Sequence, residues 1–229
     1  MVLMAGANVR HSSESNEHFT PPHVVEAARR VLGTIDLDPF SCAKANDVVR
    51  AARYYDGLHA DGWEAIWFGL LFVNPPGGMV DDNGQRVLPK CGETGACGWP
   101  TGHVHTGRHS AQKRAWQNLV REYDARRVAA AIFVCFSLEL LQTTQVDAVG
   151  PLPLDFPICY PSKRLAYSHL TTGGALVPGT QPPHASCIVY LPPKDAVGES
   201  GGWPAAHGTR KFSAEFSPIG RVVIPTVII

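Results

Sequence analysis

Two runs of consecutive apolar residues dominate the pattern of the chain. One covers residues 69–73 (G-L-L-F-V) and the other covers residues 128–136 (V-A-A-A-I-F-V-C-F). Short apolar runs of this kind are typical of strands that are buried on both faces. We therefore predict that these two segments form the centre of a sheet with helices on both sides.

Apolar residues recur at helical spacing elsewhere in the chain. The segments 23–32 and 111–127 each carry one apolar side, and a third helix is expected from about 43 to 54. Further strands are predicted at 34–40, 157–161, 185–191 and 220–224. Because strands alternate with helices, we predict an α/β protein with a mainly parallel sheet that is covered on both faces.

The chain of 229 residues has the length of one α/β domain. Residues 1–17 are polar and without pattern, and we predict a flexible N-terminal arm there. Residues 18–229 would form the domain itself. Within it, residues 79–109 interrupt the alternation of strands and helices and are rich in glycine, cysteine and histidine. This segment is too long for an ordinary connection, and we interpret it as an insertion.

Composition narrows the class of protein. The formal net charge is zero, which argues against a protein that coats nucleic acid through its overall charge, although a local basic face is compatible with it. No apolar run reaches the ~18 residues that cross a membrane, and the start lacks the pattern of a secretory signal. We expect the six cysteines to be reduced thiols in the cytoplasm, serving as packing residues or metal ligands.

The first candidate for chemistry directly follows the apolar run at 69–73. Asn74-Pro75-Pro76 is a stiff turn, because proline fixes its own φ angle and holds the preceding residue in an extended conformation. The side-chain carbonyl of Asn74 and the backbone carbonyl of Pro75 then become two fixed acceptors. They suit the two N–H groups of an exocyclic amine, whose nitrogen lone pair is freed for attack when both hydrogens are accepted. The alternative is a strand that simply stops at a Pro-Pro turn.

Acidic residues mark the end of the first predicted strand. Asp36 and Asp38 alternate with Ile35 and Leu37, and Pro39 follows. A carboxylate at the carboxyl end of a strand can bind the amino or hydroxyl groups of a cofactor, so both aspartates are candidates. The simpler alternative is a surface strand with two solvated aspartates.

The insertion supplies candidate metal ligands. Thiolates and imidazole nitrogens are the usual ligands of structural zinc. We select Cys91, Cys97, His103 and His109 as the four ligands, and the segment also holds His105. The spacing Cys-x5-Cys is wider than in a usual zinc knuckle. A glycine-rich lid with unrelated histidines is therefore the alternative.

Positive charge gathers on one side of the predicted helix 111–127. The basic residues of this helix are Lys113, Arg114, Arg121, Arg126 and Arg127. Such a side is usually a solvated face. Together with Arg108 it could also contact phosphates.

Three motifs, taken in order along the chain, resemble a known family. They are Phe19-Thr20-Pro21-Pro22, Asp36-Leu37-Asp38-Pro39 and Asn74-Pro75-Pro76. Together they resemble the phage-type DNA N6-adenine methyltransferases, which depend on S-adenosylmethionine. The resemblance runs nearly continuously from 17 to 77, and it is weaker at 140–142, 163–167 and 187–191. Each motif alone is weak, but their joint order is specific.

The resemblance implies a Rossmann-like methyltransferase fold with S-adenosylmethionine as cofactor. Phe19, Thr20 and Pro21 would pack against the methionine end of that cofactor. Asp38 and Pro39 would line the cofactor pocket, with the carboxyl group near the amino or ribose groups.

The resemblance also implies double-stranded DNA as partner, in the cytoplasm of a bacterial host that carries a phage or prophage. Asn74, Pro75 and Pro76 would hold a target adenine flipped out of the duplex. Asp61 would lie near the adenine of the cofactor. The sulfonium methyl is a strong electrophile, so catalysis would need alignment and amine activation more than a strong base.

The chain departs from the family at the end of the third motif. Gly77 stands where the family carries Tyr or Phe to stack on the flipped base, and loss of that ring would weaken target binding by roughly 1–3 kcal/mol. Trp99, Trp116 or Phe136 could supply another ring. The expected activity is methylation of adenine N6. The alternatives are cytosine N4 methylation, a catalytically inactive DNA-binding or regulatory protein, and methylation of a nitrogen in RNA or protein. The usual glycine-rich cofactor loop is also missing after Pro39.

Overall fold

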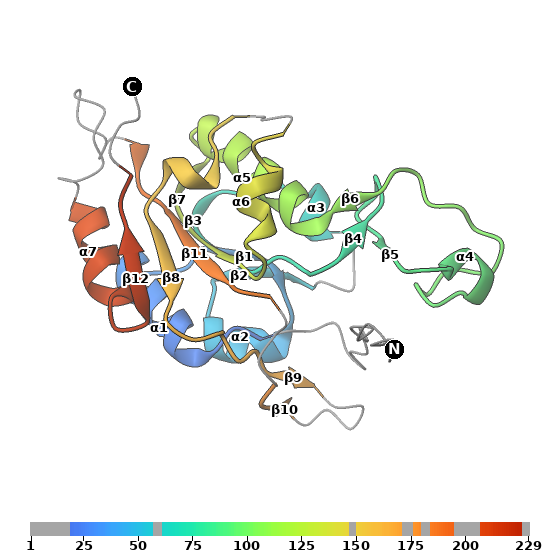
Figure 1. Ribbon diagram of the computed structural model, residues 1–229, viewed down its shortest axis with the longest axis horizontal. Helices are drawn as coiled ribbons and strands as arrows, with labels where there is room; N and C mark the ends of the chain where they lie inside the picture. The colour runs from blue at the N-terminus through green and yellow to red at the C-terminus, as the bar shows by residue number, and fades with distance from the viewer. Residues whose placement is uncertain are drawn as a thin grey trace, which may run out of the picture.

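The computed structural model describes residues 19–56, 61–146, 150–170, 176–179, 184–194 and 207–225. The predicted flexible arm, residues 1–17, lies outside these ranges. A seven-stranded sheet forms the centre of the molecule, in the order β12-β8-β11-β7-β3-β1-β2 (Figure 1). Its strands are β1 (Leu37–Ser41), β2 (Arg53–Asp56), β3 (Gly69–Val73), β7 (Val128–Cys135), β8 (Ile158–Pro161), β11 (Cys187–Leu191) and β12 (Gly220–Val223).

Most strands of this sheet share one direction. The neighbours β2, β1, β3 and β7 are parallel. β11 is antiparallel to both of its neighbours, β7 and β8, and β12 is antiparallel to β8. Five of the seven strands therefore point the same way. The predicted α/β fold with a mainly parallel sheet is confirmed, and the arrangement is compatible with a Rossmann-like fold.

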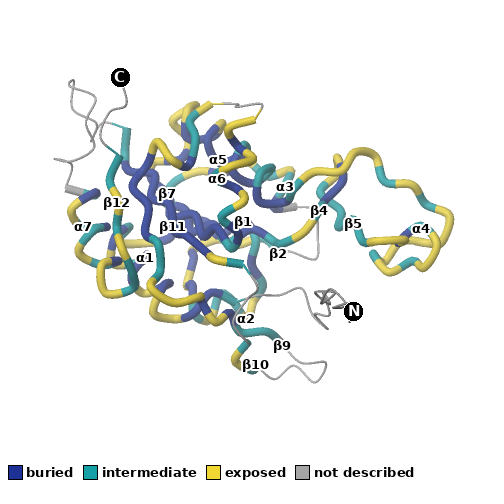
Figure 2. Tube along the Cα trace, in the orientation of Figure 1, coloured by how far each residue is buried: buried dark blue, intermediate teal, exposed yellow. Residues whose placement is uncertain are grey.

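Helices cover both faces of the sheet, as predicted. α1 (Pro22–Leu32), α2 (Ala43–Val49) and α7 (His207–Phe216) lie on one face (Figure 1). α3 (Asp61–Glu64), α5 (Ala111–Asp124) and α6 (Glu139–Thr143) lie on the other. Ile132 and Val134 of β7 pack toward α1, whereas Phe133 and Cys135 pack toward α5. Successive side chains of β7 enter two different cores, so its apolar run contains no polar position. Figure 2 shows that the central strands are buried.

The third predicted helix is shorter than expected, since α2 ends at Val49. Arg50 takes a left-handed conformation with φ 53°. Asn46 fixes this turn, because its Oδ1 accepts a hydrogen bond from Ala51 N and its Nδ2 donates to Ala51 O. Such side-chain bonds compete with continuation of a helix. The residues that follow form β2 at the edge of the sheet.

The first strand begins later than predicted and passes through its proline. β1 pairs with β2 up to Asp38, and pairing resumes at Ser41 with a shifted register. Pro39 and Phe40 lie within this irregularity, where a residue without an N–H group is tolerated. Bulges of this kind redirect side chains away from the regular pleat.

The insertion has secondary structure of its own and projects from the body (Figure 1). β4 (Met79–Val80) pairs antiparallel with both β5 (Arg86–Val87) and β6 (His109–Ser110), and α4 (Cys91–Thr94) follows β5. The other described elements are η1 (Pro153–Asp155), β9 (His169–Leu170) and β10 (Leu176–Val177). Within the described ranges, no helix is long and apolar enough to cross a membrane.

Candidate functional site

The strand order creates a switch point at β1. From β1 the chain crosses through α2 to β2 on one side, and it later returns to β3 on the other side. The three strands are parallel, so their carboxyl ends meet at one edge of the sheet. In open α/β sheets, ligands bind outside the carboxyl ends of the strands at such a point. We call this region, around Asp38 and Asn74, the switch-point edge.

The structure places two of the predicted motifs at the switch-point edge. Leu37 of β1 is aligned with Leu71 of β3, so Asp38 and Asn74 both lie farther along their strands in the same direction. The two leucines face the core under α5. Strand alternation therefore turns Asp38 to the opposite face, which α1 covers.

The Asn-Pro-Pro turn follows β3 without a gap. Pro75 is buried, and Asn74 and Pro76 are half-buried. No peptide bond in the described ranges is cis. After the turn, Gly78 adopts φ 85°, and its carbonyl accepts a hydrogen bond of 3.0 Å from Ala111 N at the start of α5. The turn is thus held from the strand on one side and from the helix on the other.

Asp38 is a buried carboxyl group near the carboxyl end of β1. The residue is 2% exposed, and its Oδ1 accepts a hydrogen bond of 3.2 Å from Phe40 N. Burial raises the pKa of Asp38 to about 7, although hydrogen bonds with Phe40 and Ser41 lower it. Among the ion pairs of the described residues, none involves Asp38. A buried acid of this kind suits a ligand group that is cationic or donates a hydrogen bond.

The Phe-Thr-Pro motif lies at the start of α1. Phe19 forms an antiparallel bridge with Ser168, with hydrogen bonds of 2.8 and 3.1 Å. Thr20 is buried, and its Oγ1 has no hydrogen-bond partner within the described part of the chain. Pro21 precedes the helix and accepts from Val24 N. Because α1 ends next to the start of β1, its own start lies toward the switch-point edge.

The structure does not place Asp36 with the other candidates. It precedes β1, and its Oδ2 accepts a hydrogen bond of 2.8 Å from Leu70 N at the start of β3. Asp36 N in turn donates to Leu70 O. Gly69 passes so close to this carboxylate that a Cβ atom there would collide with it. Asp36 therefore joins the amino ends of two strands, at the edge of the sheet opposite the one where Asp38 and Asn74 lie.

Asp61 is the first residue of α3, and its side chain lies outside what the structure describes. Its neighbour Gly62 touches the carbonyl of Pro39, and a Cβ atom at this glycine would collide with that oxygen. The start of α3 therefore lies against the carboxyl end of β1.

An aromatic and cationic chain of contacts, which the sequence pattern did not reveal, joins the insertion to the switch-point edge. The rings of Phe40 and Trp63 have centroids 4.5 Å apart. The guanidinium of Arg114 lies 5.0 Å from the centroid of Trp63, and its Nη1 donates a hydrogen bond of 2.6 Å to Asp81 O. The insertion is therefore packed onto the residues that follow Asp38.

The insertion brings four metal-binding side chains together. One ligand atom from each of Cys91, Cys97, His103 and His105 lies within 4.8 Å of all the others. Cys97 Sγ is 3.0 Å from His103 Nε2, and Cys91 Sγ is 3.1 Å from His105 Nε2. Two sulfur and two nitrogen atoms at this separation could bind a metal ion.

The hydrogen bonds behind the two histidines point to the same conclusion. His103 Nδ1 is 2.7 Å from Pro100 O, and His105 Nδ1 is 2.8 Å from Asp81 Oδ2. Both partners are acceptors, so in a neutral imidazole each Nδ1 carries the proton and each Nε2 presents a lone pair. The two Nε2 atoms are nevertheless 3.1 Å apart. A cation between them removes the repulsion between the lone pairs.

Asp81 and Cys91 have pKa values that agree with this arrangement. Burial raises the pKa of Asp81, but hydrogen bonds from His105 and from the backbone of Gln85 and Asn83 lower it below its usual value. Burial also raises the pKa of Cys91, while hydrogen bonds with its backbone and side-chain neighbours lower it to about 6. The carboxylate and thiolate forms are the ones that orient and bind a metal ion.

The fourth ligand differs from our prediction. His109 lies at the base of the insertion, in β6, where its Nε2 is 2.6 Å from Asp82 Oδ1 at the surface. His105 joins Cys91, Cys97 and His103 in the cluster instead. All six cysteines are free thiols, as expected.

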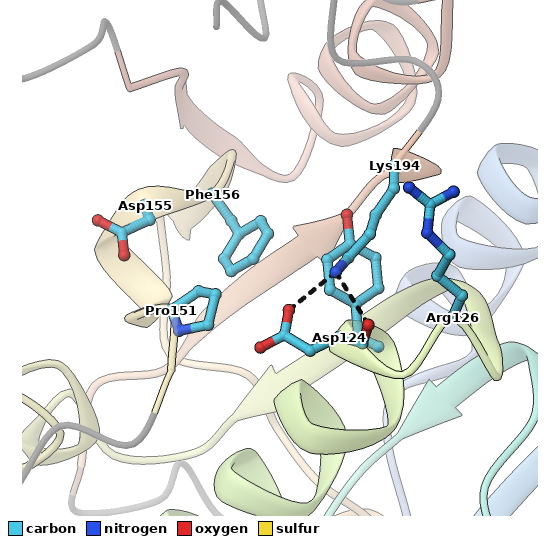
Figure 3. A pocket seen from close by; sticks show the side chains of 7 residues that line it. Asp124, Arg126, Pro151, Asp155, Phe156 and Lys194 are labelled. Atoms are coloured by element: carbon cyan, nitrogen blue, oxygen red, sulfur yellow. Dashed lines mark hydrogen bonds and ion pairs between the residues drawn. The ribbon is translucent and has the colours of Figure 1, made fainter.

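The basic side of α5 is largely used within the protein. Arg121 and Arg127 both form ion pairs with Glu122, and Lys113 Nζ donates to Val146 O. The end of α5 also borders a hollow, which Figure 3 shows from close by. This hollow is lined by Tyr123, Asp124, Arg126, Pro151, Asp155, Phe156 and Lys194. It lies at the amino end of β7, on the side of the sheet away from the switch-point edge.

No protein-family model, curated protein or solved structure matches the chain.

Proposed function

We propose that the protein transfers a methyl group from S-adenosylmethionine to the N6 amine of adenine in double-stranded DNA. The observation that carries the proposal is the position of Asp38 and the Asn74-Pro75-Pro76 turn at one switch point. The start of α1, with Thr20, lies toward the same edge. Three segments far apart in the sequence thus contribute to one region, in the manner of a ligand site.

The polar groups at this edge fit the cofactor. Thr20 presents a buried hydroxyl that has no hydrogen-bond partner among the described residues. Asp38 presents a buried carboxyl that is hydrogen-bonded to Phe40 and Ser41 but forms no ion pair with a described residue. The amino group and ribose hydroxyls of S-adenosylmethionine would supply such partners. When bound, the cofactor supplies an electrophilic methyl group on a sulfonium centre.

The Asn-Pro-Pro turn would act on the second substrate. The side-chain carbonyl of Asn74 and the backbone carbonyl of Pro75 would accept the two hydrogens of an exocyclic amine. The turn is held by β3 and α5, so the acceptors need little reorganisation when the amine arrives. A duplex base reaches such a turn only after it is flipped out of the stack.

The test is product analysis after incubation with unmethylated duplex DNA and S-adenosylmethionine. We expect N6-methyladenine among the nucleosides detected by mass spectrometry. Asn74→Ala should lower turnover by roughly 100-fold or more, because one preorganised acceptor is lost, while the dissociation constant of the cofactor stays within about twofold. Asn83→Ala, at an exposed turn of the insertion, is the matched control and should keep full activity. An active Asn74→Ala enzyme would contradict the assigned role.

The same experiment separates the alternatives. Cytosine N4 presents the same two hydrogens to Asn74 and Pro75, and its methylation would appear as N4-methylcytosine. A DNA-binding or regulatory protein without chemistry would retain DNA and yield no methylated base at saturating cofactor. The second alternative is kept because Gly77 carries no ring to stack on the base.

We propose zinc as the metal of the cluster formed by Cys91, Cys97, His103 and His105. Two thiolates and two imidazoles form a closed tetrahedral set, which is typical of structural zinc and leaves no position for a substrate. The ion would hold α4 and the following loop against β4, since Asp81 next to that strand orients His105.

Metal analysis tests this assignment with two histidine variants. Protein purified without chelator should contain about one zinc ion per chain. His105→Ala should lose most of this zinc, whereas His109→Ala should retain it because this histidine contacts Asp82 instead. Sub-stoichiometric zinc in the unchanged protein, or equal loss in both variants, would refute the site.

A further inference from the structure

Gly77 lies directly against the ring of Phe136. A Cβ atom at position 77 would be 3.1 Å from Phe136 Cζ and 3.2 Å from Cε1, which is closer than ordinary van der Waals contact. The backbone does not require glycine here, because Gly77 is absent from the described glycines with positive φ, whereas Gly78 is among them. The ring of Phe136 therefore occupies the space that a side chain at position 77 would enter.

Phe136 is well placed to act at the switch-point edge. It directly follows β7, the neighbour of β3, so it lies at the same end of the sheet as Asn74. Its half-buried side chain packs on the α1 face, the face to which Asp38 turns. Phe136 N donates a hydrogen bond of 3.1 Å to Oε1 of the buried Gln112. The backbone that carries the ring is thus fixed.

The two other rings considered from the sequence are engaged elsewhere. Trp116 is 1% exposed in the core under α5, where its ring meets Phe133 edge to face at 5.4 Å. Trp99 belongs to the insertion, and its ring centroid is 5.8 Å from that of His103. Neither ring borders the Asn-Pro-Pro turn in these contacts.

We propose that Phe136 is the residue that stacks on the target base, and that it supplies, from the position directly after β7, the ring which position 77 does not carry. The proposal rests on the proposed function, since it needs a base at the Asn-Pro-Pro turn. An aromatic ring can stack on any base. Stacking needs only the face of the ring, so the ring can come from the turn after β3 or from the position after β7. Gly77 and Phe136 then form one unit, in which the absence of one side chain makes room for the other.

Steady-state kinetics with duplex DNA and radiolabelled S-adenosylmethionine test the proposal. Phe136→Leu keeps an apolar side chain in the core but removes the aromatic face. It should lower kcat/KM for DNA by roughly 5- to 150-fold, with an unchanged dissociation constant for the cofactor. Phe136→Trp should retain most of the activity. Phe68→Leu is the matched control, because this ring is 40% exposed just before the start of β3, at the other end of the strand, and should leave kcat/KM unchanged.

A swap of the ring between the two positions makes the test independent of packing losses. Gly77→Tyr alone should impair kcat/KM for DNA, since its side chain meets the ring of Phe136. Gly77→Tyr combined with Phe136→Ala should recover it to within a few-fold of the unchanged enzyme. If the unchanged enzyme is active but Phe136→Leu matches it, the stacking role is refuted alone. If the unchanged enzyme yields no methylated base, the proposed function fails and this inference fails with it.

Discussion

Asp36 and Asp38 are chemically identical and only two positions apart, yet the fold gives them different surroundings. The carboxylate of Asp36 is satisfied by Leu70 N at the amino end of β3. The carboxyl group of Asp38 is buried. It lies nearer the carboxyl end of β1, after the position where Leu37 of β1 pairs with Leu71 of β3. The sequence pattern makes both aspartates candidates for cofactor binding, because the alternation of polar and apolar residues does not show where a strand begins. Pairing between β1 and β3, which joins residues 34 positions apart, decides between them.

The buried carboxyl group of Asp38 should make stability depend on pH. Its pKa is about 7 in the folded protein, against an ordinary value of 3.8. The folded state therefore binds this proton more tightly than the unfolded state, and the free energy of unfolding should fall as pH rises from about 4 to about 7. The difference between the ordinary and the folded pKa of Asp38 corresponds to a loss of roughly 4 kcal/mol in the free energy of unfolding over this pH range.

Asp38→Asn removes this titration and keeps an acceptor for Phe40 N. We expect the variant to exceed the unchanged protein in stability at pH 8 by a few kcal/mol, with a difference that shrinks toward pH 5. Urea unfolding at both pH values measures this. Under the proposed function, the same variant should also bind S-adenosylmethionine more weakly, because a stabilising substitution at a functional site commonly lowers function. Parallel stability profiles for the two proteins would show that Asp38 does not titrate as described.

At the scale of elements, the composition indicates the insertion, and three of the four residues in the Cys/His cluster, Cys91, Cys97 and His103, are among those that the sequence predicts. The choice between His105 and His109 could not be made from the sequence, because both are histidines at short spacing from His103. Asp81 makes the choice, since its carboxylate orients His105 from 24 positions earlier in the chain. His109 meets Asp82 instead.

Asp81→Asn should weaken zinc binding without removing a ligand. An asparagine amide can donate to His105 Nδ1, which favours the tautomer whose Nε2 carries the proton and does not bind metal. We expect a 10- to 100-fold loss of zinc affinity, measured by competition with a chromophoric chelator. Asp82→Asn is the matched control and should leave the affinity unchanged, because its partner His109 lies outside the cluster. Equal effects of the two substitutions would contradict the orienting role of Asp81.

At the scale of the whole molecule, the layers and the mainly parallel sheet follow from the sequence, but the direction of each individual strand does not. The apolar runs of β3 and β7 contribute side chains to the cores on both faces of the sheet, so the position of these strands at the centre of the sheet could be predicted. An apolar run does not specify direction, however, and the antiparallel course of β11 between β7 and β8 was not foreseen. The contacts of α5 could not be predicted from the sequence either. Arg114 of this helix donates a hydrogen bond to a backbone carbonyl in the insertion, that of Asp81. Every residue has a backbone carbonyl, so the residue types do not show which one is the partner.

The insertion leaves the body and returns to it at a single point. Met79 pairs with Ser110 across β4 and β6, and Gly78 O accepts from Ala111 N just below that pair. The path from the Asn-Pro-Pro turn into α5 is therefore already closed before the part of the insertion that carries the Cys/His cluster begins. A lobe attached in this way can be lengthened, exchanged or lost between related proteins without a break in the central sheet.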